Sequence, residues 1–82
     1  HRIAMESKRN NLEINADILR VAQGGALKTH IVYGANLNFE VVKGYLERLI
    51  GSGLLRHDPP RYYATEKGVM YLTRFNSLVR CM

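Results

Sequence analysis

The sequence feature that restricts the fold most is a short helical pattern followed by a longer one, in ALKTHIVYGANLNFEVVKGYLERLIGSG at residues 26–53. Leu27, Ile31 and Val32 give an apolar face to a helix over about 28–34, and Gly34 is expected to end it as a left-handed cap. Asn38 suits the N-cap of a second helix over about 39–51, where apolar side chains recur on one face. These side chains are Phe39, Val42, Leu46, Leu49 and Ile50.

Further elements surround this pair of helices. Apolar residues recur at helical spacing over 11–23, before Gly24-Gly25, and Thr65 is a suitable N-cap for a last helix over about 66–80. Between the helices, LLRHDPPRYYAT favours two short strands at 54–57 and 61–64. The order helix, short helix, helix, β-hairpin, helix predicts an α+β fold that is mostly helical, the winged helix-turn-helix.

The last helix carries two apolar seams, although a core of this size needs only one. The first seam is Val69, Leu72, Phe75 and Val79, and the second is Tyr71, Phe75, Leu78 and Met82. A chain of 82 residues buries a modest core and is often marginally stable alone. We therefore expect the second seam to be a dimer interface with the same helix of a second copy.

The net charge favours a polyanionic partner. Twelve Lys and Arg residues stand against seven Asp and Glu, for a net charge of +5 and a pI near 9.7. Nucleic acid is the first partner of this class and an acidic membrane the second. No apolar run approaches the roughly 18 residues that cross a membrane, and no signal peptide is recognisable. Cys81 is the single cysteine, so no internal disulfide forms and a cytoplasmic, nucleoid-associated location is expected.

Residues 1–10 are expected to be an N-terminal segment that is disordered or derived from a vector, with Met5 as a candidate natural start. Residues 11–82 form the expected domain. Nothing in it suggests catalysis: no nucleophile, base and orienting group are recognisable as a set, and Gly24-Gly25 lacks the phosphate-loop pattern. His1, His30 and His57 are too scattered to bind a metal. We expect no enzyme activity, no cofactor and no small-molecule substrate.

The helix over 39–51 is the candidate DNA-reading element, because such helices lie in the major groove. Lys43 and Arg48 face outward and suit phosphate and guanine, whereas the outward Glu40 and Glu47 cancel their charge. The same residues are equally consistent with a solvated helix face.

Other candidate DNA contacts lie at the start of these helices. Asn36 and Asn38 precede the helix over 39–51, although Asn38 fits the N-cap role better than base recognition. Lys28 and Thr29 begin the short helix and suit phosphate.

The excess positive charge lies outside the 39–51 helix, which is neutral. Residues 54–82 carry five basic and two acidic groups, and Arg56, His57 and Arg61 flank the hairpin tip at Pro59-Pro60. A wing over 56–61 that contacts the DNA backbone would use such residues.

The tyrosines are expected to have mainly structural roles. Tyr33 and Tyr45 are expected to pack between helices. Strand alternation should turn Tyr62 inward and Tyr63 outward.

The chain resembles the small archaeal winged-helix DNA-binding proteins of about ten kilodaltons. The resemblance spans about residues 11–75 and is carried by Leu12-Glu13-Ile14, Ile18-Leu19, Tyr33 to Leu37, Phe39, Tyr45 to Leu49, Gly53-Leu54, Tyr62 to Thr65 and Lys67-Gly68. It implies DNA binding through the third helix and the wing, and dimerisation through the last helix. In some members that helix is longer and forms an antiparallel coiled coil, whereas here it ends by Met82.

Two hypotheses follow. The first is a dimeric transcriptional regulator or chromatin-associated protein that binds double-stranded DNA with sequence or shape selectivity. The second is a winged-helix protein-interaction module of a larger complex, which the balanced charge of the third helix favours.

Overall fold

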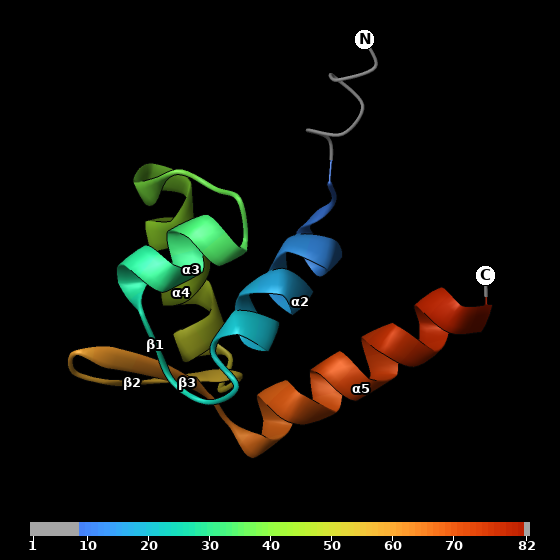
Figure 1. Ribbon diagram of the computed structural model, residues 1–82. Helices are drawn as coiled ribbons and strands as arrows, with labels where there is room; N and C mark the ends of the chain where they lie inside the picture. The colour runs from blue at the N-terminus through green and yellow to red at the C-terminus, as the bar shows by residue number, and fades with distance from the viewer. Residues whose placement is uncertain (1–8, 82) are drawn as a thin grey trace, which may run out of the picture.

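The computed structural model describes residues 9–81 and contains the predicted elements in the predicted order (Figure 1). The helices and strands are α2 (Asn11–Val21), β1 (Ala26–Leu27), α3 (Lys28–Gly34), α4 (Phe39–Gly51), β2 (Leu55–Asp58), β3 (Arg61–Ala64) and α5 (Glu66–Cys81), of which β1 was not predicted. The winged helix-turn-helix fold is therefore confirmed. The expectations for residues 1–8, including a start at Met5, and for Met82 lie outside the described residues.

Side-chain caps explain where three helices begin. Asn10 and Glu13 form a reciprocal capping box before α2, in which the Asn10 side chain accepts from the Glu13 N–H at 2.8 Å. The Asn38 side chain accepts from the Val41 N–H at 2.8 Å, and the Thr65 hydroxyl oxygen accepts from the Gly68 N–H at 3.1 Å. Each cap satisfies an amide that has no partner within its helix.

A strand that the sequence did not predict completes the sheet. β1 pairs with β3, opposite Tyr62 and Arg61, and gives an antiparallel sheet of order β1-β3-β2. A strand of two residues is too short to show an alternating pattern in the sequence, so β1 is recognised only by its pairing with β3. Across the hairpin, Leu55 pairs with Ala64 and His57 pairs with Tyr62.

The core lies among α2, α3, α4 and the sheet, and α4 does not bury the face that was predicted. Val42, Leu46 and Leu49 are buried as expected, but Phe39 is 49% exposed and Ile50 is 38% exposed. Tyr45 is buried in their place because its ring faces α2, where its hydroxyl donates to the Asn11 side chain. The buried stripe of α4 is thus turned away from Phe39.

The turn between α3 and α4 also differs from the prediction. Gly34 lies within α3 and is not a left-handed cap. A Cβ at this position would lie 2.6 Å from Cγ2 of Val21, so glycine allows α2 and α3 to approach closely. The left-handed residue is Asn36, with φ of 57°. Tyr33, which was expected to pack between helices, is 81% exposed instead.

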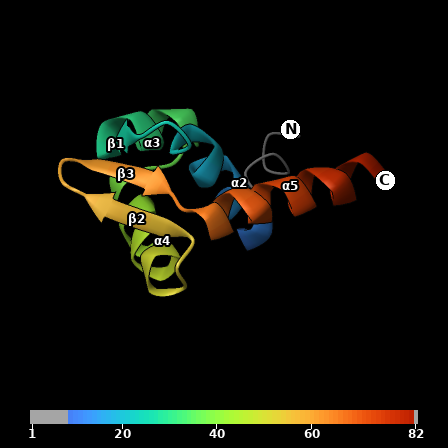
Figure 2. The ribbon, with the colours of Figure 1, turned by 90° about the horizontal axis from the view of Figure 1, so that it is seen from below.

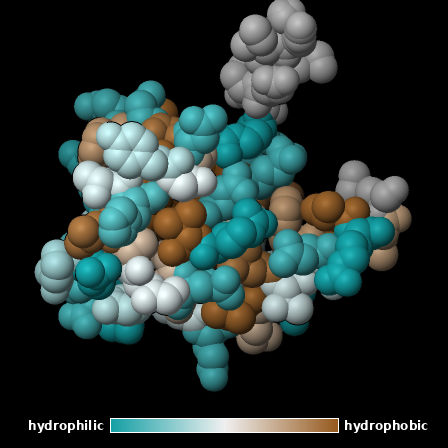
Figure 3. Space-filling model, viewed as in Figure 1, coloured by the Kyte–Doolittle hydropathy of each residue, from teal (hydrophilic) through white to brown (hydrophobic). Residues whose placement is uncertain are grey.

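Helix α5 leaves the domain body and ends far from the sheet, as both ribbon views show (Figures 1 and 2). Only Gly68 and Leu72 are buried along it, while Tyr71 and Phe75 are half-buried. The predicted first seam is therefore wrong at its two ends, because Val69 and Val79 are exposed. Hydrophobic surface follows α5 in Figure 3. Within residues 9–81, no helix combines the length and hydrophobicity that a membrane crossing requires.

Candidate nucleic-acid interface

The elements that winged-helix proteins use for DNA lie together at one end of the molecule. The start of α3, the start of α4 and the tip of the β2–β3 hairpin lie at the left in Figure 1, and the far end of α5 lies at the right. The view from below shows the same separation (Figure 2). The arrangement thus separates a compact head, residues 11–64, from the projecting helix α5.

The turn that enters α4 is held by Arg9. Its guanidinium donates to the backbone carbonyl of Asn36 at 3.1 Å and to Asp17 at 2.6 Å, and Asp17 also accepts from Arg20 at 2.7 Å. Asn36, a predicted DNA contact, is therefore first a backbone element of the turn. Arg9 belongs to the segment for which disorder was expected, and its partner is 27 residues away. No local pattern reveals such a contact.

The predicted contacts of α4 occupy different sides of the helix. Lys43 and Arg48 are five residues apart, which places them about 140° from each other around the axis. The Arg48 guanidinium lies 4.7 Å from the centre of the Tyr45 ring. Glu40 and Glu47 are exposed, and Asn38 uses its side-chain oxygen in the cap. The structure therefore does not gather these residues into one cluster.

The predicted wing residues divide between the two faces of the hairpin. Arg56 lies 4.7 Å from the Tyr63 ring centre and 3.4 Å from the Asp58 carboxylate. His57 stacks on Tyr62, with ring centres 4.1 Å apart. Neighbouring strand residues point to opposite faces, so Arg56 and His57 cannot contact the same phosphate from one face.

The inward and outward assignments of the two hairpin tyrosines hold only in part. Tyr62 packs against the core as predicted. Tyr63 is half-buried, because it lies against Gly25 as well as under Arg56.

Three of the predicted cations are exposed and form no ion pair with residues 9–81. They are Lys43, Arg48 and Arg61. Lys28 is half-buried at the start of α3, with its ammonium 5.9 Å from the Phe39 ring centre, while Thr29 and His30 are exposed. Lys28 and Phe39 therefore meet where the two helices begin.

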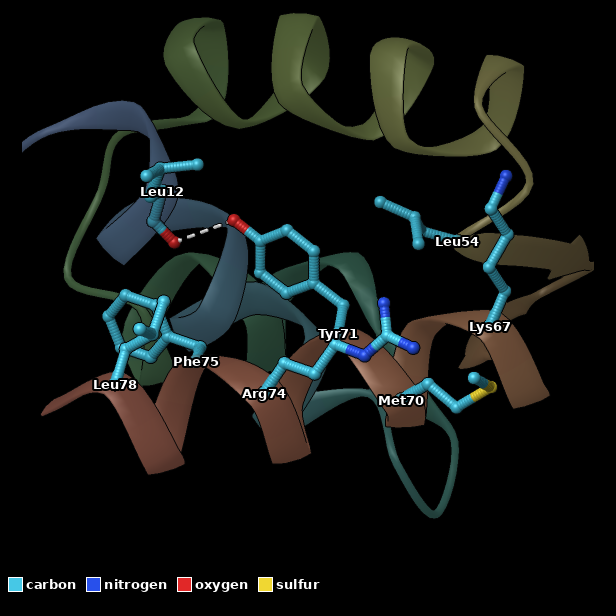
Figure 4. Close-up of a pocket in the computed structure, with 8 residues that line it drawn as sticks. All are labelled: Leu12, Leu54, Lys67, Met70, Tyr71, Arg74, Phe75 and Leu78. Carbon is cyan, nitrogen blue, oxygen red and sulfur yellow. Dashed lines mark hydrogen bonds between the residues drawn. The ribbon is translucent and has the colours of Figure 1, made fainter. Parts of the chain in front are cut away.

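The second apolar seam lines a groove between α5 and the domain body (Figure 4). Its volume is about 370 Å³, and its lining is Leu12, Leu54, Lys67, Met70, Tyr71, Arg74, Phe75 and Leu78. The Tyr71 hydroxyl donates to the backbone carbonyl of Leu12 at 3.0 Å, which ties α5 to α2. The structure thus brings together three of the four predicted dimer residues, and Met82 is not described.

No metal site is present in the described part of the chain. Among residues 9–81, no three His, Cys, Asp or Glu side chains are close enough to hold an ion. Cys81 is a free, exposed thiol at the end of α5.

Comparison with known proteins places the chain in a family. The family model described as winged helix-turn-helix matches residues 8–82. An uncharacterised protein of Methanocaldococcus jannaschii is 32% identical over 62 residues, which cover 74% of this chain and 64% of that protein. The crystal structure of Sso10a-2, a DNA-binding protein from Sulfolobus solfataricus, has 32% identity and a TM-score of 0.79, and the match covers 89% of this chain and 81% of that one. The resemblance to archaeal winged-helix proteins is thereby confirmed, and the chain belongs to the winged helix-turn-helix family.

Proposed function

We propose that the protein binds double-stranded DNA, with α4 in the major groove and the wing over 56–61 on the adjacent backbone. The observation that carries this proposal is the position of α4, the start of α3 and the hairpin tip at one end of a positively charged molecule (Figure 1). A helix and a hairpin placed in this way fit the groove and the neighbouring phosphates. The DNA-binding description of the similar Sulfolobus protein supports the same role.

Each predicted residue has a defined task in this proposal. Lys43 and Arg61 contact phosphate, because both are exposed cations without an ion pair among residues 9–81. Lys28 and Thr29 support the same strand from the start of α3. Arg48 contacts the opposite edge of the groove.

The remaining predicted residues contribute less to DNA binding in this proposal. Arg56 and His57 contribute from the two faces of the wing, and Arg56 must first leave Asp58. Asn36 and Asn38 act mainly through the shape of the turn and the cap.

The protein acts as a homodimer through α5 in this proposal. The groove beside α5 is lined mostly by apolar side chains, and Leu78 and Val79 on the same helix are 65% and 50% exposed. Two copies related by a twofold axis can each place the end of α5 against the groove of the other, since a twofold interface uses one surface twice.

Replacing Leu78 with Asp tests the dimer without disturbing the core, because this side chain is largely exposed. The wild type is expected to sediment as a dimer at micromolar concentration and Leu78→Asp as a monomer. Asn76→Asp is the matched control and should remain a dimer, because Asn76 is exposed on the same helix but does not line the groove. A wild type that remains monomeric at high concentration contradicts this part of the proposal.

The proposed biological role is that of a transcriptional regulator or chromatin-associated protein on the nucleoid in the cytoplasm. A regulator prefers its site over mixed-sequence DNA by a factor of about 10³ or more, whereas a chromatin protein shows little preference. Competition between genomic fragments and mixed-sequence DNA distinguishes the two roles.

The second candidate function is a protein-interaction module without enzymatic or cofactor chemistry. It is favoured by Glu40 and Glu47, which are exposed on α4 and would repel phosphate. In that case the positive charge of the molecule gives only weak DNA binding.

Fluorescence anisotropy of a labelled mixed-sequence duplex, titrated at several salt concentrations, tests the main proposal. For about five phosphate contacts, affinity should fall roughly 500-fold between 50 and 200 mM salt. Lys43→Ala/Arg48→Ala and Arg56→Ala/Arg61→Ala should each weaken binding and reduce the salt slope by about 2. Arg80→Ala removes a positive charge from α5 outside the groove and should leave the slope unchanged. Absence of salt-dependent binding in the wild type contradicts the proposal.

A further inference from the structure

An exposed aromatic side chain stands at the very start of α4. Phe39 is the first residue of the helix, and 49% of it is exposed although the apolar pattern places it in the core. Its position is well defined, because the Asn38 cap fixes the first turn through the Val41 N–H at 2.8 Å. N-terminal residues of a recognition helix are the ones that approach base edges. With α4 in the major groove as proposed above, an apolar side chain at this position faces the floor of the groove.

The surroundings of Phe39 favour one kind of binding partner. The Lys28 ammonium lies 5.9 Å from the centre of its ring, so a cation borders the apolar surface. The major groove offers the complementary arrangement, with phosphates along its walls and the C5 methyl groups of thymine on its floor. An apolar protein partner would match the ring but would leave the Lys28 charge partly desolvated and unpaired.

The two asparagines beside Phe39 that could read bases are occupied. Asn38 caps α4, and Asn36 forms the left-handed turn whose carbonyl accepts from Arg9. Arg48 lies against the Tyr45 ring, about two and a half turns beyond Phe39. Beside the exposed Glu40 and Lys43, the start of α4 therefore offers a base an apolar contact through Phe39.

We propose that Phe39 recognises thymine by contact with its C5 methyl group, and that the protein consequently prefers thymine-rich major grooves. This inference rests on the proposed DNA binding and adds the chemistry by which α4 selects a sequence. Burial of one methyl group changes affinity about fourfold. The preference grows with the number of methyl groups in contact.

The test compares two duplexes of one thymine-rich sequence, with either thymine or deoxyuridine at every such position. They have the same charge and base pairing and differ only in the methyl groups. The wild-type protein is expected to bind the uracil duplex at least about fourfold more weakly at fixed salt. Phe39→Ala should bind both duplexes equally, and Phe39→Leu should keep part of the preference.

Two controls make the result specific. Tyr33→Ala removes the most exposed aromatic side chain of the α3–α4 unit and should keep the full methyl preference. In a G·C-rich duplex, 5-methylcytosine restores a methyl group to the major groove and should increase wild-type affinity but not that of Phe39→Ala. Circular dichroism of each variant confirms that it is folded.

The outcomes separate this inference from the proposed function. Equal, salt-dependent binding of the thymine and uracil duplexes overturns the inference and leaves DNA binding intact. A methyl preference that persists in folded Phe39→Ala overturns the assignment to Phe39. Absence of binding to either duplex overturns both proposals, and a protein partner then becomes the occupant to seek.

Discussion

Helices α4 and α5 are similar in length but differ in how much of each is buried. The 13 residues of α4 bury Val42, Tyr45, Leu46 and Leu49, whereas the 16 residues of α5 bury only Gly68 and Leu72. Helices of this length gain most of their stability from an apolar face that packs against the rest of the protein. The head therefore buries its apolar face within one chain, whereas the outer half of α5 leaves Leu78 and Val79 exposed.

The largest expected effect comes from deleting a core side chain in the head. Leu49 is 2% exposed, so Leu49→Ala should lower the free energy of unfolding by about 2–5 kcal/mol. Leu78→Ala, the same change at a 65% exposed position, should cost less than about 0.5 kcal/mol in dilute protein. Urea unfolding measures both values. Equal losses in the two variants would contradict the difference between the helices.

The cost of Leu78→Ala should increase with protein concentration if α5 is an interface, because association stabilises the folded state by mass action. Leu49→Ala should show a loss that does not change in this way. Unfolding measured at several protein concentrations thus shows whether a second copy of the chain covers α5.

Two glycine substitutions should change stability in opposite directions. A Cβ on Gly68 would lie 2.2 Å from the backbone oxygen of Leu54, so Gly68→Ala should cost about 1–3 kcal/mol as the start of α5 is displaced. On Gly44 the nearest atom is the Arg48 guanidinium at 3.5 Å, and Gly44→Ala should add about 1 kcal/mol through helix propensity. Thermal unfolding of the two variants checks the signs. Destabilisation by Gly44→Ala would indicate a close contact that the folded chain does not show.

Local signals predicted the head well. The bounds of α4 follow from Asn38 and from Gly51 and Gly53, because caps and breakers act within a few residues. The end of α3 at Gly34 was predicted correctly, although this glycine serves the close approach of α2 and α3. The winged-helix order followed from the same signals. The roles of individual residues did not follow from local signals, since they depend on partners far away in the chain. Tyr45 packs against α2 as predicted, whereas Phe39 is exposed, because the position of α2 decides which side of α4 is covered.

The candidate site was predicted less well than the fold for the same physical reason. Composition and spacing identify which cations are present, but not that Arg56 lies beside Asp58 or that Arg48 lies over Tyr45. β1 and the contact of Arg9 with the α3–α4 turn arise only after folding. The exposure of Phe39 at the start of α4 could not be predicted either, because its spacing fits the pattern of a buried helix face.

The smallest effect compares one asparagine in each helix. Asn38 caps α4 through a 2.8 Å bond from the Val41 N–H, so Asn38→Ala should cost about 1 kcal/mol. Asn76 is exposed in the middle of α5, where alanine is the better helix former, and Asn76→Ala should add about 0.5 kcal/mol. Urea unfolding with equal m-values resolves this difference. Because the Asn38 cap also sets the position of Phe39, Asn38→Ala should reduce the thymine preference, whereas Asn76→Ala should leave it intact. Loss of stability in Asn38→Ala with an unchanged methyl preference would show that the cap supports the helix but does not orient the ring.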